Sequence, residues 1–314
     1  ALAACSGGTN ADDKNTDSSE DTYTIGVLYL DQEVLLSEAT AGCQAYAAEH
    51  SNVKLIEYNA NKDVSTQLKQ CENLISQNVD AIALTPVDGA GCDQIINACK
   101  DAGIPLICFH AKVNGAPITN ILFDNVGFGK MQVDYAMEIF EKNGGDMNGT
   151  INVGIVTGKL DNQNAVERCQ GYEEQLKNYA NATIVDEQVG SWNRDDAMAI
   201  AENWITSGRD IDIILSNNDA MAIGISLAYA NANVERPIII GVGGTEEGLT
   251  AILNGDFDGT VFQPAYQNGY DAIDFTVKYL NGETLEESYV TEGVLVTPET
   301  AQATLDDLNA MLNS

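Results

Sequence analysis

The residues best suited to bind a ligand form a polar turn, Asn217-Asn218-Asp219, which follows the apolar stretch 211–215 and Ser216. Amide side chains donate and accept hydrogen bonds, and a carboxylate accepts them. One such residue often caps the helix that follows a strand, but three in succession exceed what a cap requires. Ligands of open α/β sheets bind beyond the carboxyl ends of the strands. We therefore predict that Asn218 and Asp219 face a ligand.

Similar polar turns follow most other apolar stretches of the chain. If they converge, their amides and carboxylates suit a ligand with many hydroxyl groups. Most of these residues are also good helix caps or turn formers, so a purely structural role is at least an equal alternative for any single one. The turns lie at residues 31–33, 85–88, 110–112, 124–125, 161–164, 192–194, 217–219, 243–245 and 263–264.

The elements that must position these turns alternate regularly between strands and helices. This alternation predicts βαβ units, and hence parallel sheets covered on both faces. Apolar stretches predict strands at 23–30, 53–58, 81–84, 105–109, 118–123, 151–156, 183–189, 211–215, 237–242 and 259–263. Helical patterns lie at 38–50, 64–77, 91–102, 127–142, 164–179, 195–206 and 266–280, with a further small-residue helix from 220.

The series of strands and helices restarts after the turn at 143–149. Two sheets fit this pattern better than one, since twisted open sheets rarely exceed about ten strands. No linker rich in proline or serine separates the halves, so we expect several direct crossings and two lobes that hinge about a cleft.

The net charge of the chain disfavours two classes of binding partner. The chain has 15 Lys+Arg against 47 Asp+Glu, which gives a net charge of −32. So acidic a surface repels phosphate backbones, which disfavours nucleic-acid binding, and it docks poorly on anionic lipid.

Cysteine usage suggests a membrane anchor and no metal site. Cys5, in Leu-Ala-Ala-Cys, is typical of the end of a bacterial lipoprotein signal, and the small, acidic residues after it predict a disordered tether over 1–21. An ordinary disordered N-terminus is the alternative. Cys43, Cys71, Cys92, Cys99, Cys108 and Cys169 lack Cys-x-x-Cys spacing, and only two histidines are present, so a zinc site is not expected. Cys92 and Cys99 lie seven residues apart on one predicted helix face, which favours a role as buried apolar residues. A pair such as Cys71 with Cys99 could instead bridge neighbouring helices, and the sequence does not decide it.

Five motifs carry a family resemblance: Ile-Pro-Leu-Ile at 104–107, Phe-Asp-Asn-Val-Gly at 123–127, Asn-Asn-Asp-Ala-Met-Ala-Ile-Gly at 217–224, Ile-Gly-Val-Gly-Gly-Thr at 240–245 and Gly-Thr-Val-Phe-Gln at 259–263. Over about residues 22–297 the chain resembles the periplasmic sugar-binding proteins of the ribose/galactose type, the solute receptors of ABC importers. The resemblance implies two Rossmann-like α/β lobes with parallel sheets (periplasmic-binding-protein-like I), joined by crossings near 123–125, 263–266 and 293. The expected lobes are 22–123 plus 264–292, and 124–263 plus 293–314.

The turns and the resemblance together give candidate ligand-binding residues. Trp192 corresponds to an aromatic that stacks on a sugar ring, a contact worth about 0.5–1.5 kcal/mol beyond the area it buries. The full set is Glu33, Leu36, Thr85, His110, Asn164, Trp192, Asn218, Asp219, Gly243 and Gln263.

Four departures from the family pattern concern the ligand. Leu35 and Leu36 replace two aromatics, His110-Ala111 replaces an Asp-Arg pair, Val166 stands where a helix arginine is expected, and Gly243 replaces a carboxylate. They argue against an ordinary ribose site and favour another neutral sugar or polyol, with contacts from residues such as Glu33, Asn162 and Asn164.

Three classes of function compete. The first is a monomeric, lipid-anchored receptor that delivers a small neutral sugar or polyol to the permease subunits of an ABC importer at the outer face of the cell membrane, with no cofactor and no metal. The second, an enzyme, is not expected: Glu246 stands where a dinucleotide fingerprint needs its third glycine, and no phosphate-binding loop or nucleophile elbow is present. The third is a sensor of the same fold that presents a signalling molecule or nucleoside to a membrane partner; an acidic N-terminus excludes its DNA-binding form.

Overall fold

The computed structural model describes residues 21–89, 91–113, 115 and 117–313. Cys5 and all of the predicted tether except Asp21 lie outside the described residues. No helix in the described part of the chain is long and apolar enough to cross a membrane.

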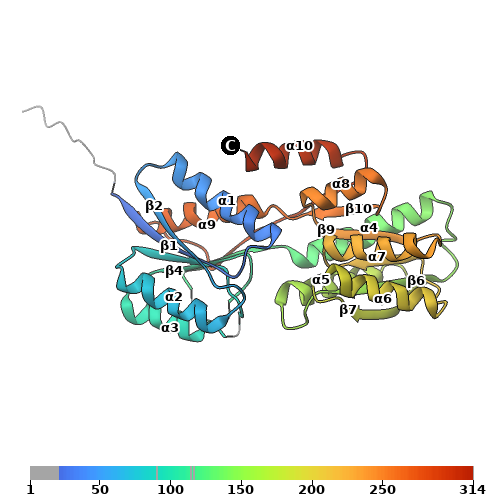
Figure 1. Cartoon of the computed structure of the whole chain (residues 1–314), viewed down its shortest axis with the longest axis horizontal. Coiled ribbons are helices and arrows are strands. Elements are labelled where there is room, and N and C mark those ends of the chain that lie inside the picture. Colours follow the sequence, from blue (N-terminus) through green and yellow to red (C-terminus); the bar gives the residue numbers. More distant parts are fainter. Residues whose placement is uncertain (1–20, 90, 114, 116, 314) are drawn as a thin grey trace, which may run out of the picture.

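The strands of the described chain form two sheets of six (Figure 1). The first sheet is parallel throughout, and the second is parallel except for its edge strand β12, which is antiparallel to β10. The first sheet has the order β11-β5-β4-β3-β1-β2 and the second β12-β10-β9-β8-β6-β7. The first contains β1 (Tyr23–Tyr29), β2 (Val53–Asn59), β3 (Ala81–Leu84), β4 (Leu106–Phe109), β5 (Thr119–Phe123) and β11 (Ser288–Thr291). The second contains β6 (Ile151–Thr157), β7 (Ala182–Val189), β8 (Ile213–Ser216), β9 (Ile238–Gly243), β10 (Gly259–Phe262) and β12 (Val294–Val296).

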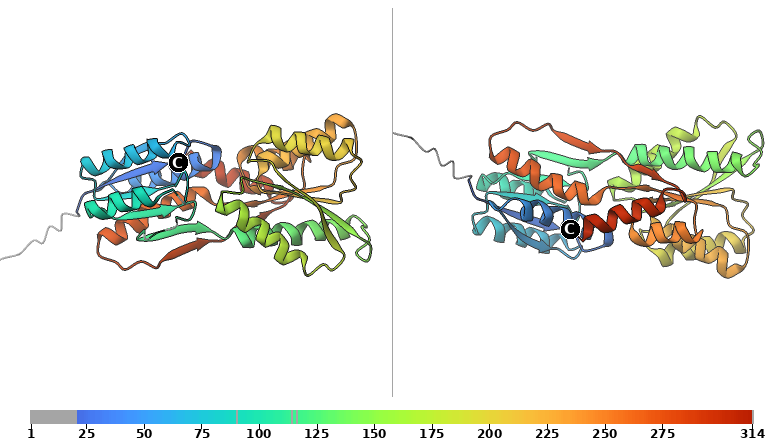
Figure 2. Two further views of the ribbon diagram at one scale, coloured as in Figure 1. Left: turned by 90° about the horizontal axis from the view of Figure 1, so that it is seen from below. Right: turned by 90° about the horizontal axis from the view of Figure 1, so that it is seen from above.

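Helices cover both faces of each sheet, as Figures 1 and 2 show. They are α1 (Val34–Glu49), α2 (Val64–Ser76), α3 (Asp93–Ala102), α4 (Asn125–Lys142), α5 (Gln163–Leu176), α6 (Arg194–Thr206), α7 (Asp219–Ala232), α8 (Glu246–Asn254), α9 (Ala265–Leu280) and α10 (Ala301–Leu312). In the first lobe, α1 and α9 pack on one face of the sheet and α2 and α3 on the other. In the second lobe, α4 and α5 oppose α6, α7, α8 and α10.

Side-chain alternation explains this layering. Along β1, Ile25, Val27 and Tyr29 join the core under α1 and α9, whereas Leu28 joins the core under α2 and α3. Successive side chains of a strand point to opposite faces. A strand buried on both faces must therefore be apolar throughout, which is the pattern that the sequence shows.

The two-lobed α/β prediction is confirmed, including its three crossings. The chain passes between the lobes from β5 to α4, from β10 to α9 and from β11 to β12. Strands β11 and β12 and helices α8 and α10 were not expected. Both strands lie at sheet edges. Strand β11 alternates exposed and half-buried residues and has Ser288 and Thr291 at its ends, and β12 is only three residues long, so neither gives the extended apolar stretch of a central strand. Helix α1 also begins at Val34, four residues before its predicted start.

Candidate functional site

The junction between the lobes is organised around Arg168, a residue of α5 that is only 3% exposed. Asn164, Arg168 and Tyr172 are spaced four residues apart and are all buried, so they form one face of the helix. Close packing against α4 fixes the position of this face. A Cβ on Gly129 would lie 2.3 Å from the carbonyl oxygen of Arg168, so only glycine allows the approach.

Arg168 connects two of the three crossings. Its Nε donates to Oδ1 of Asn125 at 3.0 Å, just after the first crossing. One terminal nitrogen donates to Oε1 of Gln263 at 2.7 Å, at the second crossing, and the other donates to the carbonyl oxygen of Asn217. Arg168, Asn125, Asn217 and Gln263 are called the Arg168 cluster below. A group that binds it therefore contacts the hinge itself.

The Arg168 guanidinium is a buried cation whose three hydrogen-bond acceptors are uncharged. Burial lowers the pKa of Arg168 to about 10, so it stays protonated at neutral pH. Its central carbon lies 5.6 Å from the centre of the Trp192 ring and 5.7 Å from that of Phe128. Cations over aromatic rings are stabilised by the negative ring face, more strongly when water is excluded.

Trp192 sits in a strained turn beside this cation. Its φ of +66° and that of Ser191, +54°, are both left-handed. The ring lies against the backbone of Gly158, where a Cβ would come within 2.2 Å of it. Left-handed backbone in residues other than glycine is uncommon and clusters at functional sites. The partly buried ring also packs against the core of the second lobe.

The turn Asn217-Asn218-Asp219 is tied closely to its own lobe. Asn217 accepts from the backbone N–H of Gly158 at 2.9 Å and donates to the Tyr172 hydroxyl at 3.1 Å. Asn218 caps α7 by accepting from the N–H of Met221 at 2.9 Å, and it donates to the carbonyl oxygen of Trp192 at 3.3 Å.

Asp219 is 2% exposed, and its carboxylate accepts three hydrogen bonds. The donors are the backbone N–H groups of Gly244, at 2.7 Å, and Thr245, at 3.2 Å, and the hydroxyl of Thr260, at 2.6 Å. Burial raises the pKa of Asp219, while these bonds and Arg168 act in the opposite direction. The carboxylate thus connects the loop that follows β9 with strand β10.

The same carboxylate explains the glycine at 243. Gly243 has a φ of +141°, and a Cβ there would lie 3.0 Å from Oδ2 of Asp219. The loop takes a backbone conformation that other residues rarely adopt, and the space beside it is occupied by Asp219.

His110 faces the second lobe from the end of β4. Its carbonyl oxygen accepts from Nδ2 of Asn164 at 3.4 Å, and Asn164 Oδ1 accepts from Asn125 at 3.2 Å. The imidazole packs edge-on against Phe123, with 5.4 Å between ring centres. Burial and the nearby Arg168 lower the pKa of His110 to about 4, so the ring is neutral at pH 7. Its Nδ1 is buried without a partner, as is Nε2 of Gln263.

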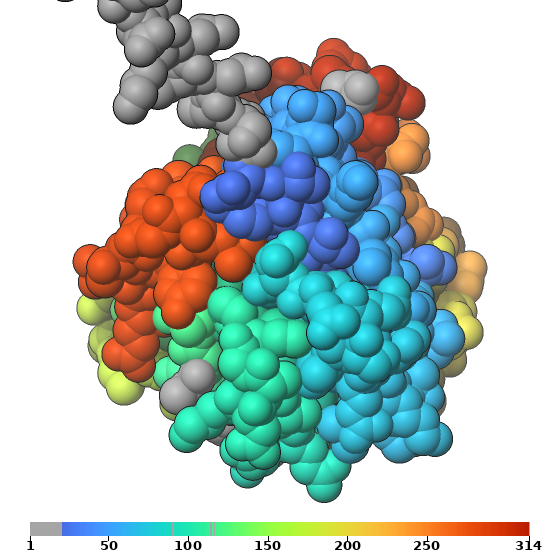
Figure 3. Space-filling model, turned by 90° about the vertical axis from the view of Figure 1, so that its left-hand side faces the viewer, coloured from blue at the N-terminus to red at the C-terminus, as the bar shows by residue number. Residues whose placement is uncertain are grey.

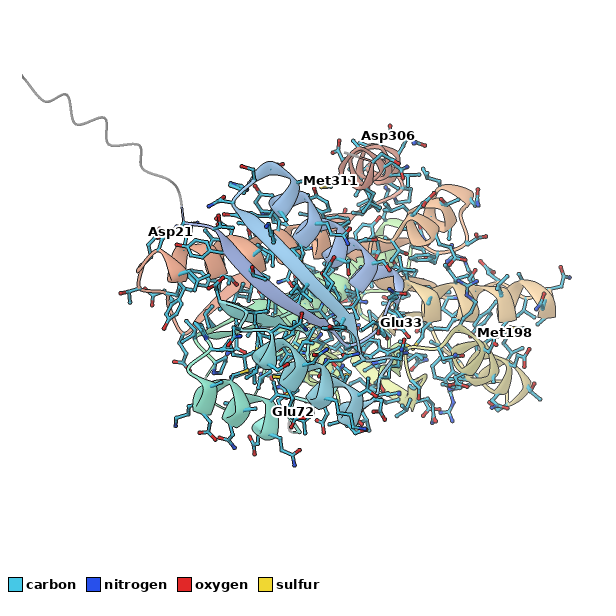
Figure 4. The ribbon with its side chains drawn as sticks, turned by 60° about the vertical axis from the view of Figure 1, so that its left-hand side comes forward. Asp21, Glu33, Glu72, Met198, Asp306 and Met311 are labelled. Atoms are coloured by element: carbon cyan, nitrogen blue, oxygen red, sulfur yellow. The ribbon has the colours of Figure 1, made fainter. Side chains whose placement is uncertain are left out.

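The other first-lobe candidates do not join the Arg168 cluster. Thr85 is fully buried, and its hydroxyl accepts from the N–H of Leu30 at 2.8 Å, so it links β1 to β3. Leu36 is 4% exposed. Glu33 is exposed and pairs with Lys62 beside an open hollow lined by Asp31, Gln32, Glu33, Asn61 and Lys62. Figure 4 places Glu33 at the start of α1, and Figure 1 shows this end of the helix turned toward the second lobe.

Sequence reasoning missed Arg168 and the buried Glu38. Asn125 and Asn217 lie in two of the predicted polar turns but were not among the candidate ligand-binding residues. It assigned the helix arginine to position 166, but Val166 is 43% exposed and Arg168, two residues later, provides the cation. The signal was available in the spacing: Arg168 lies four residues after Asn164 and therefore on the same helix face. In the described chain no cluster of His, Cys, Asp and Glu side chains suits a metal ion.

Comparison with known proteins gives consistent matches over most of the chain. A sequence family described as "Periplasmic binding protein domain" matches residues 27–284. The xylitol-binding protein of Mycolicibacterium smegmatis is 30% identical over 307 residues, which cover 97% of this chain and 83% of the relative. A putative rhizopine-binding protein of Rhizobium meliloti is 29% identical over 269 residues, 82% of this chain and 84% of that protein.

Among solved structures, an ABC transporter solute binding protein from Bacillus halodurans with bound myo-inositol has a TM-score of 0.82 and 29% identity. The match covers 91% of this chain and 98% of that one. The names of these relatives describe binding proteins.

Proposed function

Because the chain belongs to the family of periplasmic binding proteins, we propose that it captures a sugar or polyol at the lobe junction and delivers it to an ABC importer. The observation that carries the proposal is the Arg168 cluster, which places a buried cation at two crossings. A ligand held there by both lobes favours the closed form through its differential affinity, as a population shift requires.

The unpartnered atoms support a ligand with hydroxyl groups. Nε2 of Gln263 is a donor, and Nδ1 of His110 donates or accepts according to the tautomer. Sugar hydroxyls do both and would satisfy either atom. Trp192 offers a ring face to an apolar sugar face. Thr85, Asn218, Asp219 and Gly243 act mainly by holding the loops around the ligand, because their polar groups or backbones are already engaged.

Several finer features belong to the same proposal. The protein acts outside the cytoplasm as a monomer, anchored through a lipid on Cys5, and its ligand is neutral. We propose the lobe boundaries that the sequence predicts, 22–123 plus 264–292 and 124–263 plus 293–314. The alternative use of the fold is a sensor that presents its ligand to a membrane partner.

A thermal-shift screen of the chain against pentoses, hexoses, xylitol, myo-inositol, nucleosides and amino acids tests the proposal. A ligand at 100 times its Kd stabilises the folded protein by about 2.7 kcal/mol. We expect stabilisation by one or more sugars or polyols. Stabilisation only by nucleosides or amino acids would overturn the assignment of ligand class.

A further inference from the structure

Two thiols from neighbouring helices are in contact inside the first lobe. Sγ of Cys71, on α2, lies 3.6 Å from Sγ of Cys99, on α3. Cys71 is completely buried and Cys99 is 1% exposed. Both belong to the core under α2 and α3. A disulfide has an S–S bond of about 2.05 Å, so the sulfurs need to approach by about 1.5 Å.

The two helices lie side by side on the outside of this lobe, as the cyan and teal surface in Figure 3 shows. Figure 4 places Glu72, the residue after Cys71, on the outer side of α2. Because neighbours on a helix point about 100° apart, Cys71 can face inward toward α3 while Glu72 meets solvent. The contact therefore arises from the regular packing of two well-formed helices.

The other described cysteines differ from this pair in their contacts. The Cys43 thiol donates to the carbonyl oxygen of Gly269 at 3.2 Å, and Cys169 makes a long contact with Asn217. Cys92 and Cys108 are buried in the same core as Cys71 and Cys99. Among the described residues, only Cys71 and Cys99 approach each other closely enough for a sulfur–sulfur contact. The pair is thus distinguished from matched cysteines in the same protein.

We propose that Cys71 and Cys99 form a structural disulfide that joins α2 to α3. Disulfides form and persist in oxidising compartments. Formation of the bridge in the cell therefore rests on the proposed function, which places the protein outside the cytoplasm. The chemical step itself is a property of this pair of thiols and does not depend on the ligand.

The oxidant is a small-molecule disulfide. The thiolate of Cys71 attacks one sulfur of the oxidant and releases one thiol, which leaves a mixed disulfide. The Cys99 thiolate then attacks the sulfur of Cys71 and releases the second thiol. Two protein thiols are oxidised and one disulfide is reduced to two thiols. The hydrogen bond with Cys99 and burial raise the pKa of Cys71, so the exchange takes place during folding, before the thiols are buried.

The test is to refold the full chain with either oxidised glutathione or a reductant, then alkylate it under denaturing conditions. The chain without a lipid on Cys5 has seven free cysteines. We expect seven alkylated residues after reduction and five after oxidation, with a peptide linking Cys71 to Cys99 in the mass spectrum. The oxidised protein should also melt about 5–10 °C higher, because a bridge restricts the unfolded chain.

Matched variants separate this bridge from others. Cys92→Ala, in the same core, should still lose two free thiols on oxidation, whereas Cys71→Ala and Cys99→Ala should keep all six. Seven free thiols in oxidised wild-type protein, or a linked peptide that contains another pair, would overturn the proposal even if a variant fails to fold. If a sugar stabilises the reduced and the oxidised protein equally, the proposed function stands whether or not the bridge forms.

Discussion

The two lobes differ in how completely their buried polar groups are paired. Of the six buried side-chain atoms without a partner in the described chain, five belong to the first lobe and one, Nε2 of Gln263, to the second crossing. The five are Oε2 of Glu38, Oε1 of Gln70, Nδ1 of His110, Oγ1 of Thr119 and Oδ1 of Asn268. In the second lobe, by contrast, Arg168, Asn217 and Asp219 are held by several bonds each.

This difference indicates which groups can add to the binding energy of a ligand. An unsatisfied buried polar group costs about 1–3 kcal/mol, so a ligand that pairs with one recovers that cost. The second lobe offers a preassembled surface, whose polar groups are already hydrogen-bonded within the protein. We infer that the ligand docks first on the second lobe and that its bonds to first-lobe groups such as His110 favour closure.

The largest effect is expected from removing the centre of the preassembled surface. Arg168→Met leaves Asn125, Asn217 and Gln263 without their common donor, and hydrogen bonds to charged groups contribute about 1.5–3 kcal/mol each. Affinity for the ligand found in the screen should fall at least about 100-fold, measured by calorimetry. Val166→Ala, exposed on the same helix, is the control and should bind as wild type. Binding by Arg168→Met within threefold of wild type would remove Arg168 from the site.

Among the first-lobe groups, Glu38 offers the clearest test, because it is 3% exposed and its Oε2 has no partner. Burial, with a smaller contribution from Asp219, raises the pKa of Glu38 to about 8. A carboxyl whose folded pKa lies above its unfolded value of about 4.3 stabilises the fold fully below that value. This stabilisation is lost as pH rises toward 8.

The free energy of unfolding should therefore fall by at least about 2 kcal/mol between pH 5 and pH 8, since one unit of pKa difference corresponds to 1.36 kcal/mol. Glu38→Gln cannot ionise and should be less sensitive to pH over this range. The comparison of urea denaturation curves isolates Glu38 from the other acidic groups. A variant whose pH dependence equals that of wild type would show that Glu38 is not the group responsible.

In the second lobe, Asp219→Asn tests whether the carboxylate holds the loops. An amide has one acceptor oxygen, so it cannot serve Gly244, Thr245 and Thr260 together. We expect a loss of about 2 kcal/mol in the free energy of unfolding. Glu202→Gln, an exposed acid of α6, removes a charge without such bonds and should be nearly neutral. Equal effects of the two substitutions would contradict the role given to Asp219.

The sequence predicts the fold better than it predicts the site, and the reason is physical. Strands buried on both faces are apolar throughout, so β1 and β8 are visible without a structure. Short edge strands such as β11 carry no such signal. The turn at 217–219 is recognisable as polar from the sequence. Its side chains, however, hydrogen-bond to Gly244, Thr260 and Tyr172, which are distant in sequence, so the sequence does not show which polar groups remain free for a ligand.

The smallest effect is expected at Trp192, whose ring we propose to stack on the ligand's apolar face. Trp192→Ala removes a stacking contact of about 0.5–1.5 kcal/mol beyond area burial, so affinity should fall about tenfold. Trp192→Phe keeps a ring face and should recover most of it. Because the ring also packs against the core, stability is measured in parallel by denaturation. An unchanged affinity in Trp192→Ala, with the fold intact, would mean that the ligand rests on Arg168 and the hinge without stacking on Trp192.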